Sequence, residues 1–430
     1  MLKIIRGDIL FAPDKNRYEL WEDSYVLVKK GIVLSVVKEL PLSCWNQPVE
    51  DFRNCLIIPG FVDLHLHASQ WPNMGIGYDF QLLEWLKKYT FPLESTFSDM
   101  ETARKHYESF IHELSASMTT RACILATRHL PATRLLVSML RESGLGAFVG
   151  KVNMDRNADP PLLENTEDSI EETRLLAQEM QEFEQFHPDT LVHPILSPRF
   201  VPSTTPELMT ALGKMAQEYD LPIQSHLDEN LDEIAWVRQL HPGDLDFAHV
   251  YERFHLLKPD KTIMAHCIHM TEDEIRLIKD RRIFIAHCPS SNCNLASGIM
   301  PLRKYLDNDM LIGIGSDIGG GNTLDMRAHV QLAMQMSRLY YSANRSFKPV
   351  SVREAFYLAT KGGGRFFGKV GSFEKGYEFD ALVIDDGYKK GLPDKPSLET
   401  RLEKLINTDN PVLIIKKYVR GKEIQRSSLK

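Results

Sequence analysis

Residues 59–70, PGFVDLHLHASQ, are the segment that most constrains how this chain can fold. Apolar and polar side chains alternate along it, which is the two-residue period of a β-strand. Since side chains two residues apart lie on the same face of a strand, His65 and His67 could supply adjacent ligands to one metal ion. The alternative is a pair of histidines that alternate by chance. The segment therefore predicts a strand. It does not decide between a metal site and a chance pair of histidines.

Three further strand-like segments end in side chains that can bind a metal. Two of them finish in His226 and His266, and the third finishes in Asp317. In a (β/α)8 barrel the functional side chains come from the C-terminal ends of different strands and meet at one face of the barrel. The chain is thus predicted to gather these residues, together with His65 and His67, in one barrel mouth.

Apolar strand candidates alternate with helical patterns along the middle of the chain. Strand and helix repeated eight times predict an α/β fold, a parallel and closed (β/α)8 TIM-like barrel. Helix starts carry capping patterns such as Thr271-x-x-Glu274. The eight strand candidates cover residues 56–67, 119–126, 147–153, 190–196, 221–226, 261–266, 283–287 and 310–316.

The longest connection of this barrel follows the first strand and runs from residue 68 to about residue 117. It carries an apolar pattern at Leu82, Leu83, Trp85 and Leu86. Long loops at the C-terminal face of a barrel often form lids over the site. A helix that only packs on the barrel explains the same pattern equally well.

Both ends of the chain have a different pattern. Strand-like segments follow one another near the amino terminus and recur at residues 378–384 and 411–419. Strands that are apolar on one face need a second surface to cover them. We therefore expect a small discontinuous β-sandwich domain made of residues 1–57 and 367–430, beside a barrel made of residues 58–366.

Composition and charge exclude several classes of function. The 430 residues carry a formal charge of -7, which disfavours nucleic acid as a partner. The sequence has no apolar stretch long enough to span a membrane, and its amino-terminal apolar run is too short for a signal peptide, so we expect a cytoplasmic protein without a membrane partner. Six cysteines without a C-x-x-C pair indicate free thiols rather than disulfides or a cysteine zinc site.

Several short motifs follow one another in order along nearly the whole chain. The more specific ones are HASQ at 67–70, LEWLKKYTFPLE at 83–94, SPRF at 197–200, QSHLDEN at 224–230 and SDIGGG at 316–321. Together with the histidine and aspartate strand ends, they resemble the deaminase branch of the amidohydrolase superfamily and, within it, the guanine deaminases. The resemblance implies hydrolytic deamination of guanine to xanthine and ammonia, a step of purine catabolism.

The resemblance also implies a single metal ion, held by His65, His67, His226 and Asp317. Zn2+ is the expected ion and Fe2+ the alternative, because three imidazoles and a carboxylate suit such ions and leave one position for water. A bound ion can lower the pKa of that water from ~16 to roughly 7, which makes hydroxide available as the nucleophile. A two-metal relative would need a bridging lysine at the end of the fourth strand. None is present there, and we interpret Lys151, which ends the third strand, as a structural residue.

The resemblance implies a catalytic role for each of Glu229, Asp317 and His266. Glu229 would move a proton between the water and a ring nitrogen of the substrate. Asp317 would help to deprotonate the water, and His266 would orient it and stabilise the tetrahedral adduct. Acidic residues are common near Glu229, so without the resemblance an ordinary structural role would be the more economical interpretation.

A purine base is the small-molecule partner that the resemblance implies. Arg199 can donate to a carbonyl oxygen, and Gln70 offers a donor and an acceptor to a purine edge. Phe200 and Trp71 could sandwich a flat ring, although aromatic residues in loops are as often packing residues. Members of this family are commonly homodimers, so we expect a homodimer here. The other side chains expected to border the base are His226, Glu229, His266 and Asp317.

Two alternatives stay open at this point. An amidohydrolase with the same metal site could act on another ring, such as cytosine, a triazine or an adenosine-type thioether nucleoside. A barrel of this kind could also have lost catalysis and serve as a scaffold, although retaining so many costly polar groups argues against it. A nucleic-acid deaminase is disfavoured because the P-C-x-x-C motif is missing and the net charge is negative.

Overall fold

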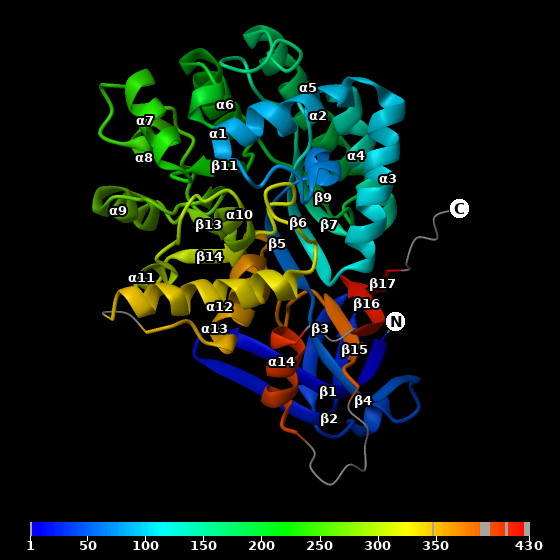
Figure 1. Ribbon diagram of the computed structural model, residues 1–430. Coiled ribbons are helices and arrows are strands. Elements are labelled where there is room, and N and C mark those ends of the chain that lie inside the picture. The colour runs from blue at the N-terminus through cyan, green and yellow to red at the C-terminus, as the bar shows by residue number, and fades with distance from the viewer. Residues whose placement is uncertain (1, 346–347, 388–395, 409–411, 425–430) are drawn as a thin grey trace.

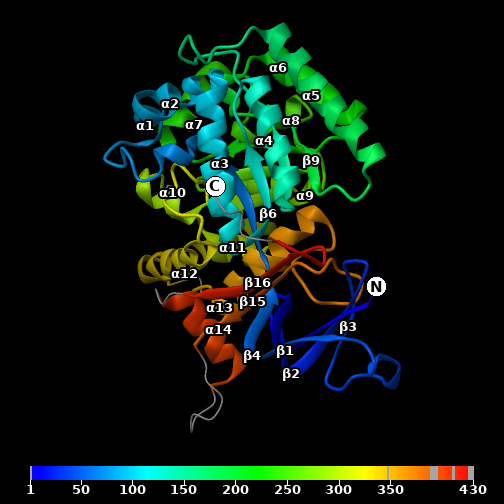
Figure 2. The same cartoon turned by 90° about the vertical axis from the view of Figure 1, so that its right-hand side faces the viewer.

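A computed structural model describes residues 2–345, 348–387, 396–408 and 412–424 of the chain. A helix-covered barrel occupies the upper part of Figure 1, and a sheet built from both ends of the chain lies below it. Figure 2 shows the same two parts from the side, with strands from the two ends of the chain together in the lower part. The fold class predicted from the sequence, a (β/α)8 barrel with a small discontinuous β-domain formed by both termini, is confirmed. The residues expected to form a β-sandwich form one seven-stranded sheet.

All eight predicted barrel strands are present. Neighbouring strands are parallel, in the orders β5-β6-β7-β9 and β11-β12-β13-β14. A bridge between Leu196 and Ile223 joins the two halves on one side, and the backbone N–H of Asp317 donates to the carbonyl of His65 at 2.8 Å on the other. The strands are β5 (Phe61–His67), β6 (Thr119–Leu125), β7 (Gly146–Gly150) with β8 (Val152–Asn153), β9 (Val192–Pro194) with β10 (Ser197–Pro198), β11 (Ile223–Leu227), β12 (Thr262–His266), β13 (Phe284–His287) and β14 (Leu311–Ile314).

Helices surround this barrel, and most of them bury apolar residues against it. The capping box expected at Thr271 and Glu274 is formed at the start of α9, and Thr205 accepts a hydrogen bond from the backbone N–H of Leu208 at the start of α6. The helices are α3 (Met100–Ala116), α4 (Leu130–Ser143), α5 (Thr166–Phe186), α6 (Pro206–Glu218), α7 (Leu231–Leu240), α8 (Phe247–Arg253), α9 (Glu272–Asp280), α10 (Pro289–Asn294), α11 (Leu302–Asp307), α12 (Met326–Ala343) and α13 (Val352–Tyr357).

The connection after β5 folds into short helical segments near the barrel mouth. Trp85 is buried and donates its indole N–H to the carbonyl of Ile76 at 2.8 Å. Tyr78 donates its hydroxyl to the carbonyl of Gly319, which follows β14, at 2.9 Å. This connection is therefore tied to the segment that follows the neighbouring strand β14. Its segments are η2 (Ala68–Asn73), α1 (Leu82–Trp85), η3 (Leu86–Thr90), α2 (Phe91–Ser95) and η4 (Thr96–Ser98).

The two ends of the chain share one seven-stranded sheet, in the order β17-β16-β15-β4-β1-β2-β3. Strand β4 continues almost directly into β5, so the sheet adjoins the N-terminal ends of the barrel strands. The predicted strand at 411–419 is β16, but residue 411 lies outside the described residues. The domain boundaries at 57/58 and 366/367 stay predictions. The strands are β1 (Leu2–Asp14), β2 (Arg17–Lys29), β3 (Ile32–Val37), β4 (Val49–Pro59), β15 (Ala381–Asp385), β16 (Leu413–Val419) and β17 (Lys422–Glu423), with helix α14 (Leu398–Asn407) between β15 and β16.

In the part of the chain that the structure describes, every helix is too short or too polar to cross a lipid bilayer.

Replacing Lys417 with Met should destabilise the contact between the terminal sheet and the barrel. The buried ammonium group of Lys417, on β16, donates to the carbonyls of Leu114, Ser115 and Ser117 at the end of α3, at 3.1–3.2 Å. Because the substitution leaves these carbonyls without a donor, we expect the free energy of unfolding to fall by about 2–4 kcal/mol. Chemical denaturation measures this change.

The neighbouring residue provides the matched control. Lys416 is partly exposed and pairs with Glu423, so Lys416→Met should change the free energy of unfolding by less than about 1 kcal/mol. Equal losses in both variants would contradict a specific role for Lys417.

Candidate active site

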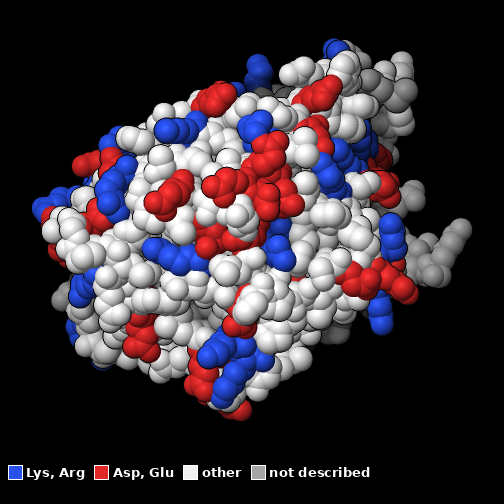
Figure 3. Space-filling view, turned by 90° about the horizontal axis from the view of Figure 1, so that it is seen from above, with Lys and Arg blue, Asp and Glu red and all other residues white. Residues whose placement is uncertain are grey.

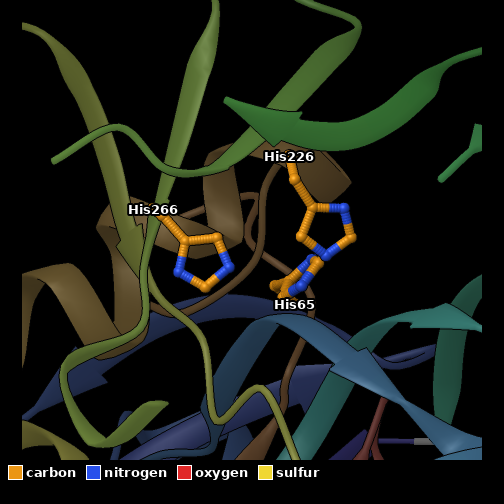
Figure 4. Close-up of side chains that lie close together, drawn as sticks. All are labelled: His65, His226 and His266. Carbon is orange, nitrogen blue, oxygen red and sulfur yellow. The ribbon is translucent and has the colours of Figure 1, made fainter. Parts of the chain in front are cut away.

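Four histidines and an aspartate converge at the C-terminal ends of the barrel strands. The strand period places His65 and His67 on one face of β5, as expected, and their ring centroids lie 5.0 Å apart. His226 ends up opposite them, with its ring centroid 4.7 Å from that of His65. Figure 4 shows the rings of His65, His226 and His266 turned towards one small space. His226 and His266 come from β11 and β12, and Asp317 follows β14.

The spacing of the candidate ligand atoms matches the shell of a single ion. Nε2 of His67 lies 3.1 Å from Nε2 of His226, and Oδ1 of Asp317 lies 3.3 Å from Nε2 of His65 and 3.5 Å from Nε2 of His67. Ligand atoms about 2.0–2.1 Å from one ion at tetrahedral angles are separated by roughly 3.3 Å. The four side chains predicted to bind one metal are therefore brought together at a suitable distance.

Several ring nitrogens of this cluster are buried without a hydrogen-bond partner among the described residues. They are both nitrogens of His65, Nδ1 of His67 and Nε2 of His266. By contrast, Nδ1 of His226 lies 2.6 Å from the carbonyl of Arg199 and Nδ1 of His266 lies 2.9 Å from Oδ1 of Asn292. These acceptors favour a proton on Nδ1 and leave each Nε2 with its lone pair facing the cluster. Unpaired buried nitrogens are costly, so this donor set fits a bound divalent ion.

Protonation in the cluster also suits metal binding. Burial, followed by the neighbouring histidines, holds the pKa of His67 and of His226 well below the usual range, so both rings are neutral. Burial alone would raise the pKa of Asp317, but the surrounding imidazoles, with that of His65 nearest, hold that pKa well below the usual range. Asp317 is therefore a carboxylate next to neutral imidazoles, which is the form in which each of these groups binds a metal.

Asp63 supports the cluster from below. It is fully buried, and its Oδ1 accepts backbone N–H groups from His65 at 3.3 Å and from Ser316 at 2.8 Å. Burial raises its pKa to about 6. Since Ser316 directly precedes Asp317, this one side chain fixes the spacing between two candidate ligands.

A pocket extends from the cluster towards the connection after β5. Predicted site residues from distant parts of the sequence meet in it, including Gln70, Arg199, Phe200 and Glu229. The apolar residues of α1 and η3 close one side of it, as expected of a lid. The full lining comprises His67, Gln70, Leu82, Trp85, Leu86, Arg199, Phe200, His226, Glu229, Glu233, His266, Leu295, Asp317 and Gly320.

Glu229 lies between the cluster and this pocket. Its Oε2 is 3.3 Å from Nε2 of His266, and its Oε1 accepts a hydrogen bond from Ser297 at 3.3 Å. Burial, followed by the negative charge of Asp317, raises the pKa of Glu229 well above the usual range. The carboxyl group can therefore carry a proton at neutral pH.

Trp71 is the predicted substrate-binding residue that the structure places elsewhere. Its ring packs against Phe110 at a centroid distance of 6.3 Å, and its indole N–H donates to Ser109 at 3.1 Å. It lines a separate groove, together with Met74. The η2 turn after β5 explains the difference, because a 3-10 turn points successive residues in different directions, so that Gln70 faces the pocket and Trp71 faces α3. The expected ring contact of Trp71 is therefore not supported.

Lys151 is not in a position to bridge two metal ions. Its buried ammonium group pairs with Glu164, which also accepts the backbone N–H of Met154 at 2.7 Å. This ion pair accounts for the burial of the lysine and agrees with its interpretation as a structural residue.

Comparison with known proteins places the chain in a family. The model of the amidohydrolase family matches residues 56–424, and guanine deaminase from Dictyostelium discoideum is 36% identical over 454 residues, covering 99% of this chain and 98% of that protein. The chain belongs to the amidohydrolase family. Human guanine deaminase is 39% identical to this amidohydrolase over 332 residues, covering 76% of this chain and 72% of that protein.

Solved structures of guanine deaminases are also similar to this chain. The guanine deaminase from C. acetobutylicum, solved with guanine bound in its active site, matches with a TM-score of 0.94 and 45% identity and covers 99% of this chain and 100% of that one. The E. coli guanine deaminase matches with a TM-score of 0.88 and 31% identity, covering 98% of this chain and 99% of that one. The match to both therefore includes the barrel and the terminal sheet.

This amidohydrolase should bind one divalent ion per chain through the cluster. His65→Ala removes a ligand from the centre of the cluster, so we expect that variant to lose most of the bound metal after reconstitution and dialysis. Elemental analysis of the purified protein measures the metal content. As a control, His193→Ala alters a histidine that pairs with Glu184 and should leave the content unchanged. Two ions per chain, or full metal content in His65→Ala, would contradict the assignment.

Proposed function

We propose that this amidohydrolase converts guanine to xanthine and ammonia by hydrolysis at C2. The observation that carries the proposal is the composition of one pocket, in which the histidine and aspartate cluster and Glu229 lie next to Arg199 and Gln70. Reactive groups and groups that can read a purine edge are thus within reach of one small ring. Similarity along the whole chain to guanine deaminases, one solved with guanine bound, supports this substrate over cytosine, a triazine or a thioether nucleoside, and over a scaffold role.

His65, His67, His226 and Asp317 would hold the catalytic metal. We propose one Zn2+ ion, with Fe2+ as the alternative, because the donor set consists of three imidazoles and one carboxylate. When bound, such an ion supplies a water molecule that is acidic enough to act as a nucleophile at neutral pH.

The remaining catalytic work is proton transfer. Asp317 is ionised and can accept a proton from the attacking water. Glu229, kept protonated by burial and by Asp317, can donate to N3 of the purine as C2 becomes tetrahedral. Asp317 can then pass the proton taken from the water to the departing amino group, and the new hydroxyl on C2 returns its proton to Glu229 as its oxygen becomes a carbonyl and ammonia leaves. Nε2 of His266, 3.3 Å from Glu229 and 3.7 Å from Oδ2 of Asp317, lies where it can orient the water and stabilise the adduct.

The base would bind at the end of the pocket that is lined by Arg199, Gln70 and Phe200. Arg199 can donate to O6 through its planar guanidinium group, and Gln70 can pair with the adjoining edge of the ring. Phe200 supplies a flat apolar surface. Trp85 and Leu86, from the connection after β5, can exclude water from the reacting carbon.

The surface around the barrel mouth suits a small base better than a polyanion. Seen from above, acidic and basic side chains are interspersed, and the acidic ones gather near the centre of the view (Figure 3). Proteins that bind nucleic acid present continuous basic surfaces instead. The homodimer and the cytoplasmic location expected from the sequence stay predictions.

Activity should depend on the protonated carboxyl group of Glu229. Glu229→Gln keeps the shape but cannot transfer the proton, so we expect kcat for guanine to fall by about 100- to 10,000-fold while the metal stays bound. Ammonia release from guanine, adenine, cytosine and isocytosine, together with metal content, measures this. The neighbouring exposed Asp232 gives the control, because Asp232→Asn should leave kcat unchanged.

The proposal names guanine as the preferred base of that panel. Equal ammonia release from cytosine and guanine would mean that the substrate is wrongly assigned. Undiminished turnover in Glu229→Gln would mean that the proton passes through another group.

A further inference from the structure

Glu94 bonds to both of the polar residues proposed to read the substrate. It lies in α2, at the end of the motif at residues 83–94, and only 3% of its surface is exposed. Its Oε1 accepts the amide N–H of Gln70 at 2.9 Å, and its Oε2 accepts from Nη1 of Arg199 at 2.6 Å. Two groups held by the two oxygens of one carboxylate must lie side by side. The orientations of both therefore depend on Glu94.

The ion pair fixes the guanidinium group of Arg199. Both side chains are buried, with 3% of the Arg199 side chain and 4% of the Glu94 side chain exposed, so solvent screens their attraction only weakly. The guanidinium carbon also lies 5.1 Å from the ring centroid of Phe91, three residues before Glu94. With Nη1 engaged by the carboxylate, the other N–H groups of Arg199 are the ones that can donate to a ligand.

The same carboxylate determines which way the amide of Gln70 faces. An ionised carboxylate accepts hydrogen bonds and cannot donate them, so the NH2 group of Gln70 must point at Glu94. The carbonyl Oε1 is then the amide atom left for a ligand. A second restraint comes from Gly319, where a Cβ atom would lie only 2.3 Å from Oε1 and 2.5 Å from Cβ of Gln70. The amide thus has its nitrogen held by Glu94 and its oxygen packed over a position without a side chain.

We propose that Glu94 is a positioning residue that sets the hydrogen-bonding pattern of the pocket, with Arg199 as donor and Gln70 Oε1 as acceptor. This inference rests on the proposed function. The pattern complements the edge of guanine, where the O6 carbonyl accepts and the adjoining N1–H donates. 2-Aminopurine carries the same amino group at C2 but lacks O6 and has an unprotonated N1, so it offers neither partner. Glu94 therefore acts on substrate choice without touching the reacting carbon.

The test is the replacement of the carboxylate by an amide of the same shape, Glu94→Gln. The new oxygen can still accept from Arg199, which leaves the new NH2 group facing Gln70. Gln70 must then turn its amide over and present a donor to the N1–H of guanine. We expect kcat/KM for guanine to fall about 100-fold, mostly through KM, and the guanine to 2-aminopurine ratio of kcat/KM to fall by a similar factor. Steady-state ammonia release with both substrates measures these changes.

Two variants separate this effect from a general loss of stability. Glu94→Asp keeps two carboxylate oxygens and should retain the substrate ratio within about threefold, even where overall activity falls. Asp8→Asn makes the same change of carboxylate to amide in another ion pair, that of Asp8 with Arg401. This pair is also buried, with 4% of the Asp8 side chain and 1% of the Arg401 side chain exposed, but it lies in the terminal sheet, away from the pocket. We expect Asp8→Asn to lower the melting temperature and to leave KM and the ratio unchanged.

The outcomes distinguish this proposal from the proposed function itself. If the unaltered enzyme releases no ammonia from guanine, the function is wrong, whatever the variants do. If it is active and Glu94→Gln keeps both its KM and its preference for guanine, the role of Glu94 is overturned. Should Glu94→Gln fail to fold, Glu94→Asp decides: a preserved ratio supports the proposal, and a ratio that collapses despite two carboxylate oxygens refutes it.

Discussion

The structure depends on the closure of the barrel between its first and last strands. There, the backbone N–H of Asp317 donates to the carbonyl of His65, and Asp63 accepts the backbone N–H groups of His65 and of Ser316, the residue before Asp317. These contacts join segments that lie about 250 residues apart in the chain. They bring a carboxylate to within 3.3 Å of an imidazole, and without them the candidate metal site would lack its only acidic ligand. The contacts that close the barrel therefore also assemble the candidate metal site.

A second buried polar layer lies next to the candidate metal site. Burying a charge is costly unless it is paired, and breaking such a pair leaves an uncompensated charge behind. The pair of Glu94 and Arg199 meets this requirement and at the same time directs the remaining hydrogen-bonding groups of Arg199 and Gln70 into the pocket. Apolar residues of α1 and η3 lie over both layers. The site thus comprises the candidate metal ligands, the residues proposed to bind the base, and an apolar cover.

The terminal sheet is linked to the barrel by charges as well as by packing. Arg121, on β6, donates to Asp380 at 3.0 Å, and the ammonium group of Lys417 binds the end of α3. Both side chains are buried where the two parts of the chain meet. They hold the sheet against the end of the barrel opposite the site, which leaves the C-terminal face free for the pocket.

Local sequence determined the strands and the identity of most candidate ligands. A period of two residues is a property of a single strand, so the pairing of His65 with His67 could be predicted, and strand ends marked by His226, His266 and Asp317 pointed to one barrel mouth. The motif resemblance added Glu229, Arg199 and Gln70. The direction of Trp71 could not be predicted, because it depends on how the η2 turn rotates after β5. The pairing of Glu94 with residues 24 and 105 positions away was equally hidden, since a buried acid looks like any surface acid until its partners are known. Sequence periodicity fixes which face of an element a side chain takes, whereas the contacts that position it across the barrel are long-range and exist only once the chain has closed.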